Sequence, residues 1–282
     1  MKLHRDQCTV SAMCRALAGA RSGYSEWLTR PPSPPAQAAP VLSERIGHHF
    51  AAPRHVYGTR RRKGCFAQAG KHGRRRRIGR LMAEQALQVK TRRKCKPTTD
   101  ASHGQAVAPN VLQRQCDIEQ PETAYVGDLT DIWTAEGWWY LAVVIDVFSR
   151  AVVGWSMHRW RKAARVTKAF QRALAQRQPR PGCIMQTDRG SQYAADRYVQ
   201  LLPHYEIVPR MRRTGHGWDN AVAERFFQTG KTEWVYLEPF ATREQAQNAI
   251  CDSIEVFSNR QRRHSANGHL APVLYEQSQK AA

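Results

Sequence analysis

The chain has 282 residues, and its 44 lysines and arginines against 23 aspartates and glutamates give a formal net charge of +21. Such a length permits one large domain or two to three small ones, and such a charge indicates a polyanionic partner, because each neutralised phosphate releases counterions. Seven scattered cysteines without a Cys-x-x-Cys pair argue against a zinc ribbon or a disulfide framework and fit a reducing compartment.

The longest apolar run, residues 138–148, is too short to cross a bilayer, and the N-terminus lacks the apolar core of a signal peptide. We therefore expect a protein that works in the cytoplasm, associated with the nucleoid and without membrane contact. The charge is uneven: residues 1–120 carry 23 basic and 7 acidic side chains, a net +16, against +5 for the remainder.

Residues 1–35 are predicted to form a helix-turn-helix segment. Ser11 is expected to cap a first short helix, Gly19 and Ser22-Gly23 have the chemistry of a turn, and Tyr24 lies near the start of a second helix. Prolines at 31–35 should end the segment, because proline cannot continue a helix. Any helical hairpin shares this pattern, so the motif alone does not establish DNA binding.

Residues 36–97 are predicted to form a basic helical DNA-binding segment, followed by a linker over residues 98–119. Apolar residues in helical spacing follow the second of two basic blocks, which favours a folded element over a disordered tail. A solvated basic surface or a targeting signal is the alternative. The residues of the second block that we expect to bind DNA are Arg74, Arg75, Arg76 and Arg77.

Residues 120–280 are predicted to form an α/β core with a C-terminal helical extension. The expected elements, in chain order, are strands 124–134, 138–148 and 151–158, helix 161–176, strand 183–186, helix 191–202, strand 206–211, a helix capped by Asp219 or Asn220, and a helix opened by a capping box at 242–245. This order predicts a mixed five-stranded sheet of the ribonuclease H type with flanking helices, preceded by small all-α segments.

Three acidic residues of this core have unusual surroundings. Asp128 falls within the first strand, Asp188 ends the fourth strand, and Glu224 lies one turn into the helix after residue 220. In this topology the first and fourth strands are neighbours, so the three carboxylates should converge. Their repulsion would be relieved by divalent cations, and two Mg²⁺ or Mn²⁺ ions can clamp the attacking and leaving oxygens of phosphoryl transfer.

Four stretches of the core are similar to the motifs of a known protein family. They are Gly127-Asp128-Leu-Thr-Asp131, Thr187-Asp-Arg-Gly-Ser-Gln-Tyr193, Trp218-Asp-Asn-Ala-Val-Ala-Glu224 and Val256-Phe-Ser-Asn-Arg-Gln-Arg-Arg-His-Ser265. Through them, residues 120–275 closely resemble the integrase catalytic core of bacterial insertion-sequence transposases, in particular the OrfB type. The resemblance implies a retroviral-integrase-like fold, with Asp128, Asp188 and Glu224 as catalytic metal ligands. It also implies that Lys231, seven residues after Glu224, lies near DNA.

Other polar residues have more than one reading. Asp131 should face away from Asp128 along the strand, and Asp146 is expected to hold a turn. Gly230 weakens the helix that carries Glu224, which should fray there. The remaining candidate DNA contacts are Arg189 and Asn220, which could equally cap helices, and Arg260, Arg262 and Arg263, which are expected to contact phosphate.

The resulting hypothesis is a DNA transposase that nicks a transposon end and transfers the freed 3′ hydroxyl to another phosphodiester. The alternatives are a ribonuclease H-like nuclease and an inactive or regulatory DNA-binding relic of the element. Expected partners are the transposon ends, target DNA and further copies of the chain in an oligomer on DNA. The protein of the upstream reading frame is a possible further partner.

Overall fold

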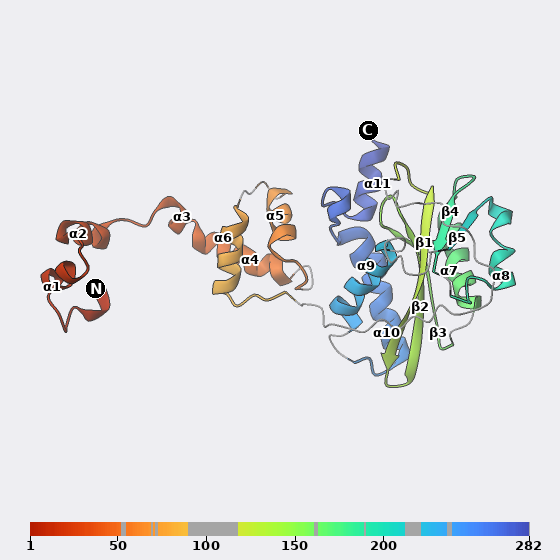
Figure 1. Ribbon diagram of the computed structural model, residues 1–282, viewed down its shortest axis with the longest axis horizontal. Helices are drawn as coiled ribbons and strands as arrows, with labels where there is room; N and C mark the ends of the chain where they lie inside the picture. The colour runs from red at the N-terminus through yellow and green to blue at the C-terminus, as the bar shows by residue number, and fades with distance from the viewer. Residues whose placement is uncertain are drawn as a thin grey trace.

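The computed structural model (Figure 1) describes residues 1–51, 55–68, 70, 73–89, 118–160, 163–188, 190–211, 221–235 and 239–281. Most of the predicted linker over residues 98–119 lies outside this set. So do Arg189 and Asn220, together with the predicted helix cap at Asp219 or Asn220.

The N-terminal segment contains two short helices, α1 (Val10–Ala16) and α2 (Arg21–Thr29), after a 3-10 turn η1 (Lys2–His4). Thr9, not the predicted Ser11, caps α1, because its hydroxyl accepts a hydrogen bond from the amide of Ala12 at 3.3 Å. The predicted turn residues Ser22 and Gly23 lie inside α2. Helix α2 therefore begins at Arg21, before the turn that was predicted at Ser22 and Gly23.

The next segment has four helices: α3 (Pro34–Gln37), α4 (Ala39–Ala51), α5 (Thr59–Gln68) and α6 (Arg75–Glu84). The last three share an apolar core that includes the predicted stripe of α6. The buried Arg62 donates hydrogen bonds to the carbonyls of Ile46 at 3.2 Å and Tyr57 at 2.9 Å. Arg62 belongs to the first of the two basic blocks, residues 60–63, and stabilises this segment from its interior.

Five strands form one mixed sheet in the order β3-β2-β1-β4-β5. Strands β1, β2 and β3 make an antiparallel meander, and β4 and β5 run parallel to β1 (Figure 1). Their bounds are β1 (Ala124–Thr134), β2 (Gly137–Asp146), β3 (Val152–His158), β4 (Ile184–Thr187) and β5 (Val208–Met211). The predicted five-stranded sheet and the adjacency of its first and fourth strands are confirmed.

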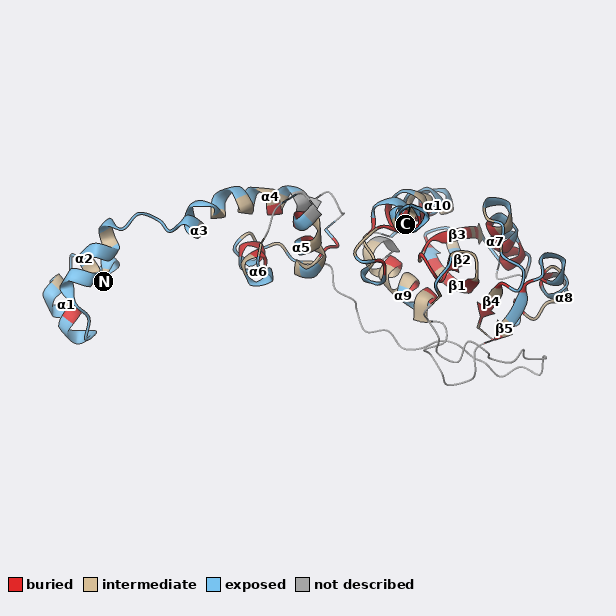
Figure 2. Cartoon of the chain, turned by 90° about the horizontal axis from the view of Figure 1, so that it is seen from above, coloured by how far each residue is buried: buried red, intermediate tan, exposed pale blue. Residues whose placement is uncertain are grey.

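Alternation along β1 sends its side chains into two separate cores, one on each face of the sheet. Tyr125 packs with α7 (Ala163–Gln176) and α8 (Asp196–Val199), whereas Ala124 and Val126 pack with helices from the C-terminal third. Figure 2 shows buried residues concentrated in the sheet and on the helix faces turned toward it. A carboxylate on the even-numbered side of β1 therefore faces the C-terminal helices.

The predicted helix over residues 191–202 is wrong in extent. Only α8 is α-helical there, with turns before it and the 3-10 helix η2 (Pro203–Tyr205) after it. The amide of Tyr193 donates to the carbonyl of Gly190 at 2.9 Å, and the ring packs edge-on against Tyr198. Tyr193 is therefore buried in a turn and not in the helix that its spacing predicted.

The C-terminal third contains α9 (Ala221–Gly230), the π-helix η4 (Lys231–Val235), α10 (Arg243–Cys251), the π-helix η5 (Asp252–Gln261), η6 (Ser265–Asn267) and α11 (Pro272–Lys280). Helix α9 ends at Gly230, where weakening was expected. The predicted capping box of α10 is present, because Thr242 accepts from the amide of Gln245 and Gln245 accepts from that of Ala241. None of the described helices is both long and apolar enough to span a membrane.

The basic helical segment contacts the C-terminal extension. Val56 and Tyr57 share an apolar cluster with Phe257, and the amide of Arg263 donates to the hydroxyl of Tyr57 at 2.8 Å. These contacts join residues about two hundred positions apart in the chain, and they bring α5 beside η5.

Candidate active site

Asp128 lies at the middle of β1, opposite Val143 of β2, with its side chain partly exposed. It belongs to the even-numbered side of the strand, which faces the C-terminal helices. Its Oδ1 accepts a hydrogen bond from the amide of Leu129 at 2.8 Å. The carboxylate is therefore oriented by the backbone and remains accessible from the sheet face.

Asp188 follows directly after β4. The parallel register of β1 and β4 ends with the pair Val126 and Gln186, and Asp128 and Asp188 each lie two residues beyond this last pair. Neighbouring strands lie about 4.8 Å apart. The Oδ1 of Asp188 accepts from the amide of Gly190 at 2.9 Å. Two of the predicted ligands therefore lie at matching positions on neighbouring strands, and each accepts a hydrogen bond from a backbone amide.

Tyr193 is buried in the core that contains Tyr125 and Met185, and the sequence patterns did not single it out. Burial raises the pKa of Tyr193 well above its ordinary value, and the nearby carboxylates of Asp128 and Asp188 raise it further. Within the described part of the chain, no group hydrogen-bonds to its buried hydroxyl.

Glu224 lies in the first turn of α9, with its side chain exposed. The helix packs on the even-numbered face through Ala223 and Phe227, in the same core as Val126 of β1. No three His, Cys, Asp or Glu side chains among the described residues are close enough to share a metal ion. Glu224 is therefore on the correct side of the sheet, but it is not joined to the two aspartates.

The other two acids of the core have the predicted positions. Asp131 lies on the odd-numbered side of β1, away from Asp128. Asp146 is buried, and its two oxygens accept from the amides of Ser149 and Glu122, each at 2.8 Å. Burial raises the pKa of Asp146, against the opposing effect of these hydrogen bonds. Asp146 holds the turn after β2.

Two of the predicted DNA contacts differ from expectation. Lys231 is partly buried and begins η4, so the two-turn α-helical spacing that would align it with Glu224 stops at Gly230. Arg262 is buried and forms a two-pronged ion pair with Glu233, one contact being 2.7 Å between Nη2 and Oε1. Its guanidinium is engaged inside the fold and not presented on the surface.

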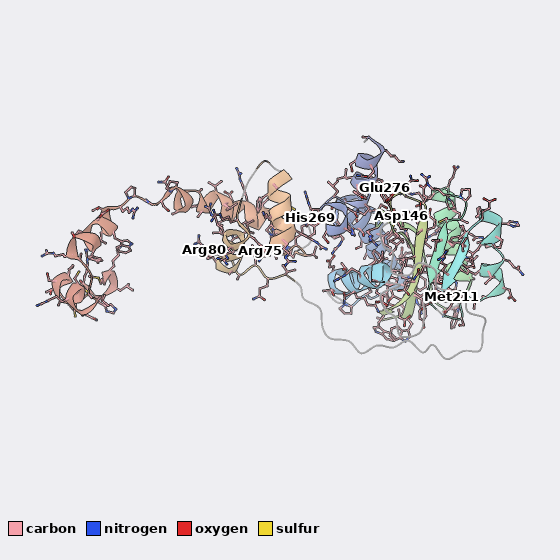
Figure 3. All side chains as sticks on the ribbon, turned by 45° about the horizontal axis from the view of Figure 1, so that its top comes forward. Arg75, Arg80, Asp146, Met211, His269 and Glu276 are labelled. Atoms are coloured by element: carbon pink, nitrogen blue, oxygen red, sulfur yellow. The ribbon has the colours of Figure 1, made fainter. Side chains whose placement is uncertain are left out.

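The remaining basic candidates are more accessible. Arg260 is exposed, and Arg263 donates to the carbonyl of His269 at 3.3 Å. Arg74, Arg75 and Arg76 are exposed at the start of α6, and Arg77 is partly buried. Figure 3 labels Arg75 and Arg80 on α6, and it labels Asp146 in the part of the chain that contains the sheet. The accessible arginines therefore belong to two separate parts of the chain.

Comparison with known proteins gives two family matches. Residues 118–217 and residues 205–272 each match a family described as "Integrase core domain". Both matches fall in the part of the chain that contains the sheet and the C-terminal helices.

Full-length relatives cover nearly the whole chain. An "Insertion element IS600 uncharacterized 31 kDa protein" of Shigella sonnei is 36% identical over 265 residues, covering 94% of this chain and 97% of the relative. The "Transposase InsF for insertion sequence IS3A" of Escherichia coli (strain K12) is 34% identical over 275 residues, covering 97% and 96%. A similar solved structure is the HTLV-2 integrase catalytic core domain, with 17% identity, a TM-score of 0.37, and coverage of 52% of this chain and 93% of that one.

Proposed function

The chain belongs to the insertion-sequence transposases that carry an integrase core domain, and we propose that it cleaves and joins DNA strands with divalent metal ions. The ligands in this proposal are the carboxylates of Asp128, Asp188 and Glu224. The observation that supports it is the parallel register of β1 and β4, in which Asp128 and Asp188 each lie two residues beyond the pair Val126 and Gln186, while α9 covers the face of the sheet that contains Val126.

The donor set fits a hard divalent cation. Two neighbouring carboxylates repel each other, and oxygen ligands are those that Mg²⁺ and Mn²⁺ prefer. Backbone amides already orient one oxygen of Asp128 and one of Asp188. When bound, two such ions supply activation of the attacking oxygen and stabilisation of the leaving 3′ oxygen. The protein would contribute one carboxylate from β1, that of Asp128, and one directly after β4, that of Asp188.

Glu224 is the third ligand in the proposal. It lies on α9, which packs against β1 and β2 through the core shared with Val126. Its exposed carboxylate leaves it accessible to an ion held by the two aspartates. In this proposal α9 has to adjust, because Asp128 lies within β1 and Asp188 directly follows β4.

We further propose that residues 1–35 and 36–97 bind the transposon ends, that residues 98–119 connect them to the core, and that the chain works as an oligomer on DNA. The exposed Arg74, Arg75 and Arg76 support this assignment, because surface arginines contact phosphates without reading sequence. A contribution from the protein of the upstream reading frame belongs to the same proposal.

The test is a strand-cleavage and strand-transfer assay on DNA that carries the terminal inverted repeats, with Mg²⁺ or Mn²⁺. Asp188→Asn should abolish nicking and joining and leave DNA binding intact. Asp131→Asn is the matched control, because it makes the same change on the opposite face of β1 and should retain activity.

Full activity of Asp188→Asn would contradict the proposal. DNA binding by the wild-type chain without any metal-dependent chemistry would favour a regulatory or inactive relic. Cleavage of RNA–DNA hybrids without strand joining would favour a ribonuclease H-like nuclease.

A further inference from the structure

A cavity of about 800 Å³ lies between the basic helical segment and the C-terminal extension. Arg61 of α5 lines it on one side, and Arg225 of α9 and residues of η4 and η5 line it on the other. The contact of Tyr57 with Arg263 and Phe257 closes α5 onto this region. Most of the lining belongs to the core, and Arg61 is its contribution from the basic helical segment.

The charged side chains of this lining are strongly unbalanced. Four arginines, at positions 61, 150, 225 and 262, face the cavity with one carboxylate, that of Glu233. Glu233 is paired with Arg262. Among the described residues, no ion pair is recorded for Arg61 or for Arg225. The lining as a whole lacks enough negative charge to balance its guanidinium groups.

The positive charges of the arginines lower the pKa of one another and of His264. Burial lowers the pKa of Arg61, and Arg262 and Arg225 lower it further, with Glu233 opposing them. Burial lowers the pKa of His264 to about 3, with Arg262, Arg61 and Arg150 adding to the effect. The imidazole is therefore neutral at physiological pH. Its buried Nε2 has no hydrogen-bond partner within the described ranges.

Like charges that converge in a partly buried space are costly, and an anion relieves that cost. Arginine matches phosphate because its planar guanidinium can donate two parallel hydrogen bonds. Thr229 and Ser258, which carry hydroxyl groups, also line the cavity. Serine and threonine hydroxyls are common partners of backbone phosphates in protein–DNA complexes.

We propose that this arginine cavity binds a phosphodiester of the DNA backbone and thereby fixes α5 against α9. This inference rests on the proposed function in one respect, namely that DNA is the substrate. The cavity is larger than one phosphate, so it has room for the adjoining sugars. Because Arg225 directly follows Glu224 in α9, a phosphate held there would fix the helix that carries the third proposed metal ligand.

The first measurement is the salt dependence of DNA binding, made without divalent metal. Arg61→Gln and Arg225→Gln should each reduce the slope of log affinity against log salt concentration by about 1, because each removes about one phosphate contact. Arg172→Gln is the matched control. Arg172 is exposed on α7, on the opposite face of the sheet, and donates to the carbonyl of Trp155 at 2.8 Å. Arg225→Lys, which keeps the charge, should recover most of the slope.

The second measurement is thermal unfolding at constant ionic strength, with inorganic phosphate replacing chloride. Phosphate should raise the Tm of the wild-type protein, because a ligand that binds only the folded state stabilises it. The gain should disappear in Arg61→Gln and Arg225→Gln and persist in Arg172→Gln. At low salt without phosphate, the two cavity variants should unfold at or above the wild-type temperature, because removing one guanidinium relieves repulsion.

Slopes of both cavity variants equal to that of Arg172→Gln would overturn the inference. A phosphate-dependent rise in Tm with unchanged DNA slopes would also overturn it, since the cavity would then take free phosphate and not DNA. Reduced slopes together with no strand cleavage by the wild-type chain would support the cavity while the proposed catalytic function failed. The two proposals therefore fail on different measurements.

Discussion

Asn259 connects the C-terminal extension to the sheet, and its removal should destabilise the core. Its Oδ1 accepts from the amide of Val152 at 2.9 Å, and its Nδ2 donates to the carbonyl of Val152 at 2.9 Å. Asn259 is 8% exposed and Val152 2%. Because β3 is an edge strand, the side-chain amide of Asn259 takes the place of a sixth strand at this point.

Asn259→Ala would leave both backbone groups of Val152 buried without their partner. A buried donor or acceptor that loses its partner costs about 1–3 kcal/mol. Loss of the partner of two such groups should lower the free energy of unfolding by about 2–4 kcal/mol, because water that enters the vacated space satisfies them in part. Total stabilities are about 5–15 kcal/mol. The variant should therefore fold, but with a clearly lower free energy of unfolding.

The assay is urea unfolding followed by far-UV circular dichroism. The midpoint should fall while the slope m stays unchanged, which is the result for a lost interaction in the folded state. Asn259→Asp should be at least as destabilising, because it sets a carboxylate oxygen against the carbonyl of Val152. Asn248→Ala, exposed on α10, is the control and should change stability by less than about 0.5 kcal/mol. A result for Asn259→Ala within that same range would refute the reasoning.

Two further predictions concern other parts of the core. In Gly154→Ala the added Cβ would clash with the carbonyl oxygen of Ala169 in α7, so the helix must move. Chemical unfolding should show a stability lower by about 3 kcal/mol. The control is Gly19→Ala, which has nothing within 4 Å of the added Cβ and should leave stability unchanged. An equal effect of the two alanines would contradict this packing argument. His264 is neutral when folded, so below its unfolded pKa of about 6.5 only the unfolded chain gains a proton, and stability should fall by about 1–2 kcal/mol between pH 7 and pH 5. His264→Gln should lose that part of the pH dependence, and identical pH profiles would count against it.

Local patterns predicted most of the sheet. The bounds of β1 agree with the predicted strand, because alternation and β-branched runs are properties of neighbouring residues. The adjacency of β1 and β4 followed from the order of elements. Tyr193 shows where such patterns fail: its spacing is helical, but its burial against Tyr198 decides the local geometry. Packing of this kind depends on residues that a local window does not contain.

The strand order that makes β1 and β4 neighbours was predictable for the same reason. The convergence of Asp128 with Asp188 rests on that order and stays a prediction. The ion pair of Arg262 with Glu233 joins residues 29 positions apart, across α10 and η5. The contact of Tyr57 with Arg263 spans 206 positions. No spacing rule reports such contacts, so the engagement of Arg262 and the arginine cavity emerged only from the folded chain.

The most direct test of the central claim is Mn²⁺ binding to the purified chain, measured by isothermal titration calorimetry. The wild-type protein should bind Mn²⁺, and Asp128→Asn, Asp188→Asn and Glu224→Gln should each weaken binding by at least about ten-fold, because each removes one carboxylate ligand. Asp131→Asn should bind as the wild type does. Wild-type affinity in Asp128→Asn or Asp188→Asn would contradict the claim that these neighbouring strands hold the metal.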